Sequence, residues 1–212
     1  MIRVQEAGST VIQKNYDRDY FEKWYRDPKH AVTSAPTLRR KVALAVATAE
    51  YYLGHEVRNV LDVGCGEGVW RKPLRELRPQ IEYLGLDSSE YVVARYGASR
   101  NIRLAEFGQL GELRFDREFD LIVCSDVLHY VPTNELRRGL RGIGEMLAGV
   151  AFLELFTTSD EPEGDRHGFH HRTAKWYLGT FAEAGLTALG SHCYLAQRLV
   201  ESIAALEAPA LF

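Results

Sequence analysis

The stretch Val60-Leu61-Asp62-Val63-Gly64-Cys65-Gly66-Glu67-Gly68, VLDVGCGEG, contains an apolar run interrupted by one acid and then three alternating glycines. Glycine weakens regular strands and helices because it loses the most backbone freedom on folding. Glycines at this spacing, directly after a strand-like run, therefore predict a turn at which something approaches the backbone closely.

Apolar runs of strand length alternate with helical segments from Val57 onward. Runs that are apolar on both faces suit parallel strands covered from both sides. The alternation therefore predicts an α/β fold, a doubly wound, Rossmann-like, mostly parallel sheet with helices on both faces. The expected strands span residues 57–63, 81–87, 102–107, 119–127, 149–156 and 186–195. The expected helices span residues 69–77, 89–96, 134–147 and 173–184, with only a short helix between 107 and 119.

The segment before this region is predicted to be helical because its aromatic residues fall at helical spacing. They are Tyr16, Tyr20, Phe21, Trp24 and Tyr25. Pro28 and Pro36 break the pattern, so a second helix is expected from about Leu38 to Leu53, ended by Gly54. The aromatic residues either form a lid over a ligand or pack on the edge of the sheet, and both interpretations stay open.

The composition is that of an ordinary globular protein. Of the 212 residues, 46% are apolar and 26% are charged, and the net charge of −3 gives no global basic field of the kind that favours nucleic-acid binding. The length suits one domain. We therefore expect residues 1–212 to form a single domain, with 1–54 as a helical extension or lid and 55–212 as the core.

The cysteines and the N-terminus indicate an intracellular protein. Cys65, Cys124 and Cys193 form an odd set without CxxC spacing, which favours reduced thiols over disulfides or a zinc site. The first residues lack the apolar core of a signal peptide. No stretch approaches the roughly 18 uncharged apolar residues that a membrane span needs. A cytoplasmic protein without a membrane segment is expected.

The position of the glycine turn predicts a ligand site. In a doubly wound sheet, ligands bind beyond the carboxyl ends of the strands, at the point where the strand order reverses. The turn and the helix after it can direct backbone N–H groups at such a ligand. Asp87 ends the next expected strand, 21 residues after Gly66, and an acid there can accept hydrogen bonds from both ribose hydroxyls. The pattern predicts a nucleoside-containing cofactor.

A nicotinamide dinucleotide fits this turn poorly. The GxGxxG fingerprint requires a third glycine where this chain has Val69. Asp62 lies two residues before the first glycine, where it would repel a pyrophosphate and attract a sulfonium or an amino group. An NAD-dependent oxidoreductase is therefore disfavoured.

At these residues the sequence resembles the class I S-adenosylmethionine-dependent methyltransferases. VLDVGCGEG is similar to their first motif, LGLDSS (84–89) to the second, and FDLIVCSDVLHYV (119–131) to the fourth. The resemblance covers roughly residues 57–185. It implies the class I methyltransferase fold, S-adenosyl-L-methionine as the cofactor and S-adenosyl-L-homocysteine as its product.

The resemblance also implies roles for residues at the first two strand ends. Asp62 would face the amino group at the methionine end of the cofactor. Asp87 would hold the ribose hydroxyls, with Ser88 following closely. The backbone that passes under the methionine and ribose would be that of Gly64, Cys65 and Gly66.

Two further segments receive roles by the same resemblance. Glu106 would reach the adenine amino group and Phe107 would pack on the ring, although the family usually has Asp where this chain has Glu106. Ser125, Asp126 and Val127 would border the transferable methyl group at the end of the fourth motif strand.

The C-terminal segment departs from the family pattern. The family normally closes its sheet with a two-stranded hairpin. After the expected strand 186–195 this chain continues as QRLVESIAALEAP, whose apolar residues fall at helical spacing. Whether residues 196–208 form the seventh strand or a helix stays open.

Histidines supply the candidate catalytic group and one acceptor contact. His129 lies just past the fourth motif strand, where a near-neutral base could take a proton from an acceptor. The alternative is a histidine that packs or hydrogen-bonds behind the cofactor pocket. His170 is a candidate acceptor contact, since the connection after the fifth strand lines that pocket in related methyltransferases. His167 and His171 lie beside it among acids, but no second cluster completes a metal site, and no metal is expected.

The acceptor is expected to be a small molecule, methylated on oxygen or nitrogen. Enzymes that methylate amino groups of nucleic-acid bases often carry Asn/Asp-Pro-Pro-Tyr at the place where this chain reads Ser125-Asp126-Val127-Leu128, and the chain has no basic arm. Two alternatives stay open, a protein or nucleic-acid acceptor and a catalytically silent cofactor-binding partner subunit. A monomer or homodimer is expected.

Overall fold

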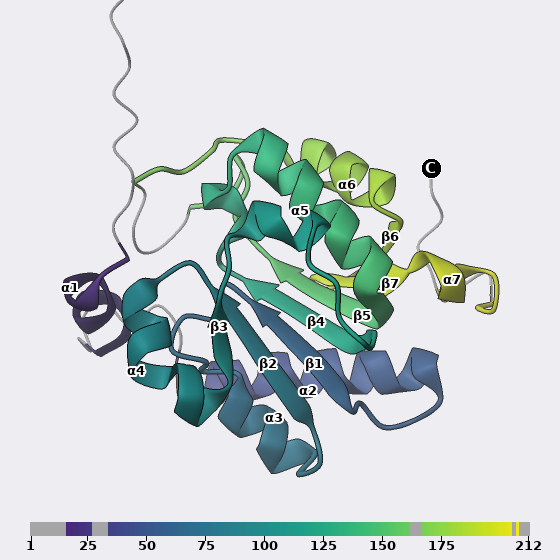
Figure 1. Ribbon diagram of the computed structural model, residues 1–212. Helices are drawn as coiled ribbons and strands as arrows, with labels where there is room; N and C mark the ends of the chain where they lie inside the picture. Colours follow the sequence, from purple (N-terminus) through teal and green to yellow (C-terminus); the bar gives the residue numbers. More distant parts are fainter. Residues whose placement is uncertain (1–15, 27–33, 162–166, 205–206, 208–212) are drawn as a thin grey trace, which may run out of the picture.

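The computed structural model of the chain describes residues 16–26, 34–161, 167–204 and 207. Seven strands form one sheet in the order β3-β2-β1-β4-β5-β7-β6, with helices on both faces (Figure 1). The strands from β3 to β5 are parallel, and β7 runs antiparallel to both β5 and β6. The predicted doubly wound, mostly parallel sheet is confirmed.

The strand order places the predicted turn at the reversal point of the sheet. β1 lies between β2 and β4, so the chain builds outward from β1 in both directions. The carboxyl ends of β1, β2 and β4 therefore meet at one edge of the sheet. The strands are β1 (Asn59–Val63), β2 (Glu82–Asp87), β3 (Ile102–Leu104), β4 (Phe119–Ser125), β5 (Leu147–Glu154), β6 (Leu186–Gly190) and β7 (Cys193–Ala196).

The sheet ends in a hairpin, so the single strand expected over 186–195 is wrong. Ser191 and His192 lie between β6 and β7 with φ of 50° and 64°. Consecutive left-handed residues reverse the chain tightly, but this usually takes Asn or Gly, so Ser-His gave no turn signal. The seventh strand therefore precedes residues 197–200, which form the short helix α7 (Gln197–Val200).

The second helix of the chain begins earlier than predicted. Ser34 caps α2 (Ala35–Leu53), and its hydroxyl accepts a hydrogen bond from the Thr37 N–H. Pro36 lies in the first turn, where a missing N–H removes no helical hydrogen bond, so the expected break at this residue is wrong. Gly54 ends the helix with a φ of 71°, as predicted.

The remaining helices lie close to their expected positions. The connection after β3 contains the short helix predicted there, in the 3₁₀ form. The helices are α1 (Arg18–Phe21), the π-helical turn η1 (Glu22–Arg26), α3 (Arg71–Leu77), α4 (Glu90–Arg100), η2 (Phe107–Gly111), η3 (Leu128–Tyr130), α5 (Thr133–Met146) and α6 (Ala174–Glu183). Among the described helices, none combines the length and the hydropathy that a membrane span requires.

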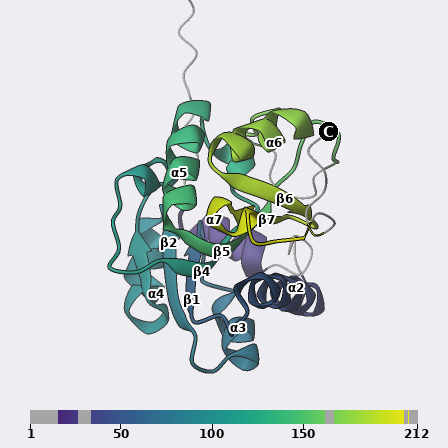
Figure 2. The same ribbon diagram turned by 90° about the vertical axis from the view of Figure 1, so that its right-hand side faces the viewer.

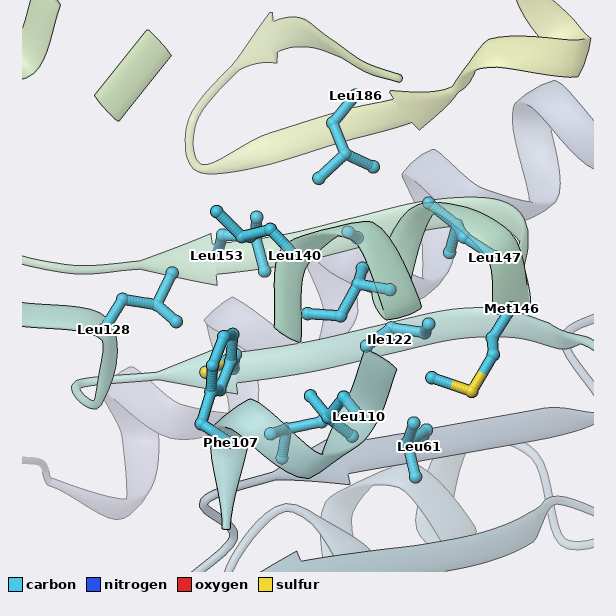
Figure 3. Close-up of a cluster of buried hydrophobic side chains, with 14 of the residues drawn as sticks. Leu61, Phe107, Leu110, Ile122, Leu128, Leu140, Met146, Leu147, Leu153 and Leu186 are labelled. Carbon is cyan, nitrogen blue, oxygen red and sulfur yellow. The ribbon is translucent and has the colours of Figure 1, made fainter. Parts of the chain in front are cut away.

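Two apolar layers hold the sheet between its helices. α2 and α3 cover one face, and α5 and α6 cover the other (Figures 1 and 2). The α5 layer includes Leu61, Ile122 and Leu140, all fully buried (Figure 3). The α2 layer includes Val46 and Phe152. The sequence predicts an extension up to residue 54 and a core after it. Because α2 packs into this apolar layer, it belongs to the core although it precedes residue 55.

The N-terminal aromatic segment packs beside α4. The Phe21 ring is buried and stacks on Tyr91, with 5.9 Å between ring centroids. The Ser89 hydroxyl donates to the Tyr16 carbonyl at 2.6 Å. Cys65 belongs to the same apolar cluster, so the segment also borders the glycine turn. The packing interpretation is confirmed for Phe21, and the lid stays a prediction.

Candidate active site

The glycine turn after β1 has the backbone that only glycine adopts easily. Gly64, Gly66 and Gly68 have φ of 65°, 52° and 73°. The N–H groups of Gly64 and Cys65 both donate to the Leu86 carbonyl, at 2.8 and 3.1 Å, which ties the turn to β2. The predicted tight turn is confirmed.

The close neighbour of the turn is another segment of the chain. A Cβ placed on Gly64 would lie 2.5 Å from a methyl group of Val127, just beyond β4. The missing side chain therefore lets the end of β4 approach the end of β1. These are the two strand ends that the sequence assigns to the cofactor and to the methyl group.

Asp87 at the end of β2 clamps the turn. Its Oδ2 accepts from the Gly66 N–H at 2.7 Å and its Oδ1 from the Ser89 N–H at 2.9 Å. Burial raises the pKa of this carboxyl, and the two N–H donors act in the opposite direction. Each oxygen retains a second lone pair for a ligand. Ser88 is exposed, and Ser89 rather than Ser88 makes the hydrogen bonds.

Asp62 lies under the turn and is held by a residue that the sequence did not single out. Its side chain is 2% exposed, and the Tyr83 hydroxyl donates to Oδ2 at 2.7 Å. The pKa of Asp62 is raised to about 7, mainly because the carboxyl is buried. The hydrogen bond from Tyr83 lowers this pKa, and the nearby Asp87 carboxylate raises it. In sequence, Tyr83 is only another apolar residue of a strand.

A second polar group lies at the ends of β4 and β5. The Ser125 hydroxyl donates to Glu154 Oε2 at 2.6 Å. The Lys41 ammonium from α2 lies 2.7 Å from Oε1 and 2.8 Å from Oε2. Glu154 is the acid at the end of the otherwise apolar strand β5, so the sequence carries a signal for it. The sequence gives no signal that Lys41 is its partner, because 113 residues separate Lys41 from Glu154.

His129 is fully buried next to this group. Its Nδ1 accepts from the Phe156 N–H at 3.4 Å, and its Nε2 lies 3.6 Å from Asp126 Oδ1. Since Nδ1 accepts, a neutral ring carries its proton on Nε2, facing the Asp126 carboxylate. This tautomer favours the packing interpretation, and the role as a base stays a prediction.

The connection after β5 covers the His129 ring. Phe169 stacks on it with 4.8 Å between ring centroids, and the His170 N–H donates to the His129 carbonyl at 2.8 Å. The His170 side chain itself is exposed. Within the described ranges, no three His, Cys, Asp or Glu side chains are grouped as metal ligands would be.

The two residues expected at the adenine face differ in exposure. Glu106 is exposed, and its N–H donates to Gln109 Oε1 at 2.8 Å. Phe107 is 8% exposed, and its ring points into the core against Gly139 of α5, where a Cβ would overlap it (Figure 3). Of the lid candidates, Tyr20 and Trp24 are half-buried on the N-terminal segment.

Comparison with known proteins identifies the family. A family model for the methyltransferase domain matches residues 17–198. A trans-aconitate 2-methyltransferase from Deinococcus radiodurans is 39% identical over 75 residues, 34% of this chain and 28% of that protein. A tRNA U34 carboxymethyltransferase from Nautilia profundicola is 28% identical over 113 residues, 49% of this chain and 37% of that protein. The chain spans well under half the length of the curated relatives it matches.

Solved structures identify the fold. The amino pentose methyltransferase CalS10 from Micromonospora echinaspora, solved with S-adenosylmethionine bound, superposes with a TM-score of 0.59 at 15% identity. The match covers 75% of this chain and 91% of that chain. At this identity the likeness defines the fold, which is the Rossmann-like class I methyltransferase fold.

Proposed function

The chain belongs to the methyltransferase domain family, and from this premise we propose that it is an S-adenosylmethionine-dependent methyltransferase. The methyl group is transferred to an oxygen or nitrogen atom of a small-molecule acceptor. Asp62, Asp87, Gly64, Cys65, Gly66 and the residues at and after the end of β4 keep the roles that the sequence predicts for them, whereas the Phe107 ring packs in the core against Gly139 and is not assigned to the adenine. The chain acts as a single domain, with Tyr16, Tyr20 and Trp24 of the N-terminal extension forming a lid over the cofactor and the acceptor.

One observation carries the proposal: two carboxylates flank one glycine turn. Asp87 is fixed against the Gly66 N–H at 2.7 Å, and Asp62 is buried just below the turn. Two acids around a backbone cradle suit a nucleoside that carries hydroxyl groups and positive charge. They oppose a phosphate, because like charges repel strongly at these distances.

The residues of the chain bind and orient the reactants. Asp87 accepts hydrogen bonds from the ribose hydroxyls, and Asp62 attracts the amino group of the cofactor. When bound, S-adenosylmethionine supplies a methyl group activated by its positively charged sulfur. Alignment of an acceptor atom with that group and exclusion of water account for the rate. Ser125, Asp126 and Glu154, at the ends of β4 and β5, align the acceptor and exclude water.

The small-molecule acceptor is supported by the relatives and by charge. CalS10 is described as an amino pentose methyltransferase, and the Deinococcus relative as a trans-aconitate methyltransferase. The net charge of −3 argues against a phosphate backbone as acceptor. The relative described as acting on tRNA keeps a nucleic-acid acceptor as the alternative to be tested.

Calorimetry with S-adenosylhomocysteine tests the cofactor assignment, with NADH as the comparison ligand. We expect S-adenosylhomocysteine to bind and NADH not to bind. Turnover is then measured as S-adenosylhomocysteine formation with polycarboxylates, amino sugars and unmodified tRNA as acceptors. Absence of S-adenosylhomocysteine binding contradicts the proposal. Binding without turnover on any acceptor class favours the silent partner subunit.

A further inference from the structure

The Tyr83 hydroxyl occupies a central place beneath the glycine turn. In the parallel pair of β1 and β2, Asp62 lies opposite Gly85, and Tyr83 lies two residues before Gly85 on the same face. A Cβ on Gly85 would lie 2.7 Å from Cys65 Sγ and 3.2 Å from the Tyr83 hydroxyl oxygen. Because Gly85 has no side chain, the Tyr83 side chain can lie over this position of the sheet, and its hydroxyl reaches Asp62.

The Tyr83 hydroxyl binds Asp62 at the end of β1 and lies close to the glycine turn. It donates to Asp62 Oδ2 at 2.7 Å, and a Cβ on Gly68 would lie 3.3 Å from it. Tyr83 is 3% exposed and Asp62 is 2% exposed, so water does not compete for this bond. Within the described part of the chain, no other group donates a hydrogen bond to the Asp62 carboxylate. One carboxylate oxygen thus accepts from Tyr83, and the other accepts no hydrogen bond from the described residues.

We propose that Tyr83 is a positioning residue for cofactor binding: its hydroxyl keeps Asp62 ionised and turned so that the second carboxylate oxygen receives the cofactor's ammonium group. Tyr83 thereby sets the pH above which the amino-acid end of the cofactor binds. This inference rests on the proposed function, since it concerns the same cofactor. It adds a residue that touches no reacting atom and acts only through Asp62.

The groups that face Asp62 make its ionisation sensitive to this one hydrogen bond. They are Tyr83 and Asp87 of β2 and Cys65 of the turn, while Cys124 of β4 lies on the opposite face of the sheet and Arg71 of α3 faces Tyr83 rather than Asp62. None of the groups facing Asp62 supplies a positive charge. Burial raises the pKa of Tyr83, Cys65 and Cys124. These three side chains therefore stay neutral over the range from about pH 5.5 to 9 in which binding is to be measured.

The sign of the pH effect follows from the charges. An ionised Asp62 attracts the ammonium group and a protonated one does not. The pKa of Asp62 is raised to about 7, so affinity rises with pH up to that value and levels off above it. Without the Tyr83 hydroxyl the pKa of Asp62 rises further, so the increase in affinity moves to higher pH.

The test is calorimetry of S-adenosylhomocysteine binding to the wild type and Tyr83→Phe between pH 5.5 and 9. We expect the variant to bind about tenfold more weakly below pH 6.5 and within about twofold of the wild type at pH 9, which is a shift of about one pH unit. The ratio of the two dissociation constants is used because it cancels the titration of the ligand's own amino group.

A second probe separates Asp62 from Asp87. 5′-Methylthioadenosine has the base and ribose of the cofactor but no amino-acid end. It engages Asp87 and not Asp62, so we expect Tyr83→Phe to bind it as the wild type does at every pH. Equal weakening of both probes would mean that the variant distorts the turn, and it would overturn the proposal.

Two further variants keep the result interpretable. Tyr177→Phe removes another buried tyrosine hydroxyl, bonded to Arg172 at 3.2 Å on the opposite face, and should leave both probes unaffected. Asp62→Asn keeps a partner for Tyr83 and should abolish the pH dependence of the S-adenosylhomocysteine to 5′-methylthioadenosine affinity ratio between about pH 5.5 and 7, where the ligand's own amino group stays protonated. A pH dependence that survives Asp62→Asn contradicts the inference, even if Tyr83→Phe does not fold. A wild type that binds neither probe contradicts the proposed function instead.

Discussion

The two halves of the candidate site are built in different ways. The cofactor half consists of the glycine turn, Asp62 and Asp87, all within 26 residues of sequence, and backbone N–H groups of the turn and of Ser89 hold Asp87. The acceptor half joins Lys41, Ser125 and Glu154, which come from three distant segments and interact through side chains. The residues of the first half are recognisable as a motif, although the Tyr83 contact to Asp62 is not, whereas the second half exists only once the sheet and α2 have packed.

His129→Ala is expected to give the largest effect and to test whether the acceptor half needs a packed histidine or a base. Removal of the fully buried ring should lower the free energy of unfolding by about 3 kcal/mol. Turnover should fall, while S-adenosylhomocysteine affinity at a temperature where the variant is folded should be unchanged. Urea denaturation and calorimetry measure the two quantities.

His129→Phe is the matched control, because it keeps an aromatic ring in the buried site and removes both nitrogens. If His129 acts as a base, this variant loses turnover despite near-normal stability. Wild-type turnover in His129→Phe would leave only the packing role.

Gly64→Ala tests the contact between the two halves. A left-handed φ of 65° and a methyl group of Val127 at 2.5 Å both oppose a Cβ at this position. We expect the free energy of unfolding to fall by about 2.5 kcal/mol, measured by urea denaturation. In Gly64→Ala/Val127→Ala the overlap is relieved and part of the loss should be recovered. An equal loss in the single and double variants would mean that backbone strain alone is responsible.

Asp87→Ala tests the cofactor half by itself. The variant removes a charged acceptor that also clamps the Gly66 and Ser89 N–H groups. We expect S-adenosylhomocysteine to bind about 30-fold more weakly, equivalent to about 2 kcal/mol, as measured by calorimetry. Asp116→Ala, at an exposed acid away from the turn, is the control. Unchanged affinity in Asp87→Ala would remove the ribose assignment.

Glu154→Gln is expected to give the smallest effect and to be confined to the acceptor half. Lys41 loses its charged partner and Ser125 a charged acceptor, both in a half-buried setting, so stability should fall by about 1 kcal/mol. S-adenosylhomocysteine affinity should remain within about twofold, while the KM for an identified acceptor should rise. Glu118→Gln breaks an exposed ion pair with Arg198 and serves as the control. A loss of cofactor affinity equal to that of Asp87→Ala would mean that the two halves are not separable.

The accuracy of the sequence predictions follows the same division. The glycine turn, the acid at the end of β2 and the order of strands and helices were predictable, because each depends on neighbouring residues or on a short period. The hairpin between β6 and β7 was missed, because Ser191 and His192 adopt left-handed backbone without the usual turn residues. Pro36 is not a break, because Ser34 caps the helix before it and proline is tolerated in the first turn.

The fold class, the glycine turn and the acids that flank it can be read from the amino-acid sequence, since local backbone preference and apolar periodicity encode them. Only the tertiary structure decided that Tyr83 holds Asp62, that Lys41 and Ser125 meet on Glu154, and that the His129 ring is fully buried. The physical reason is that these contacts depend on strand register and on how α2 and the connection after β5 pack against the sheet. Such distances arise when the whole chain folds, and no short stretch of residues specifies them.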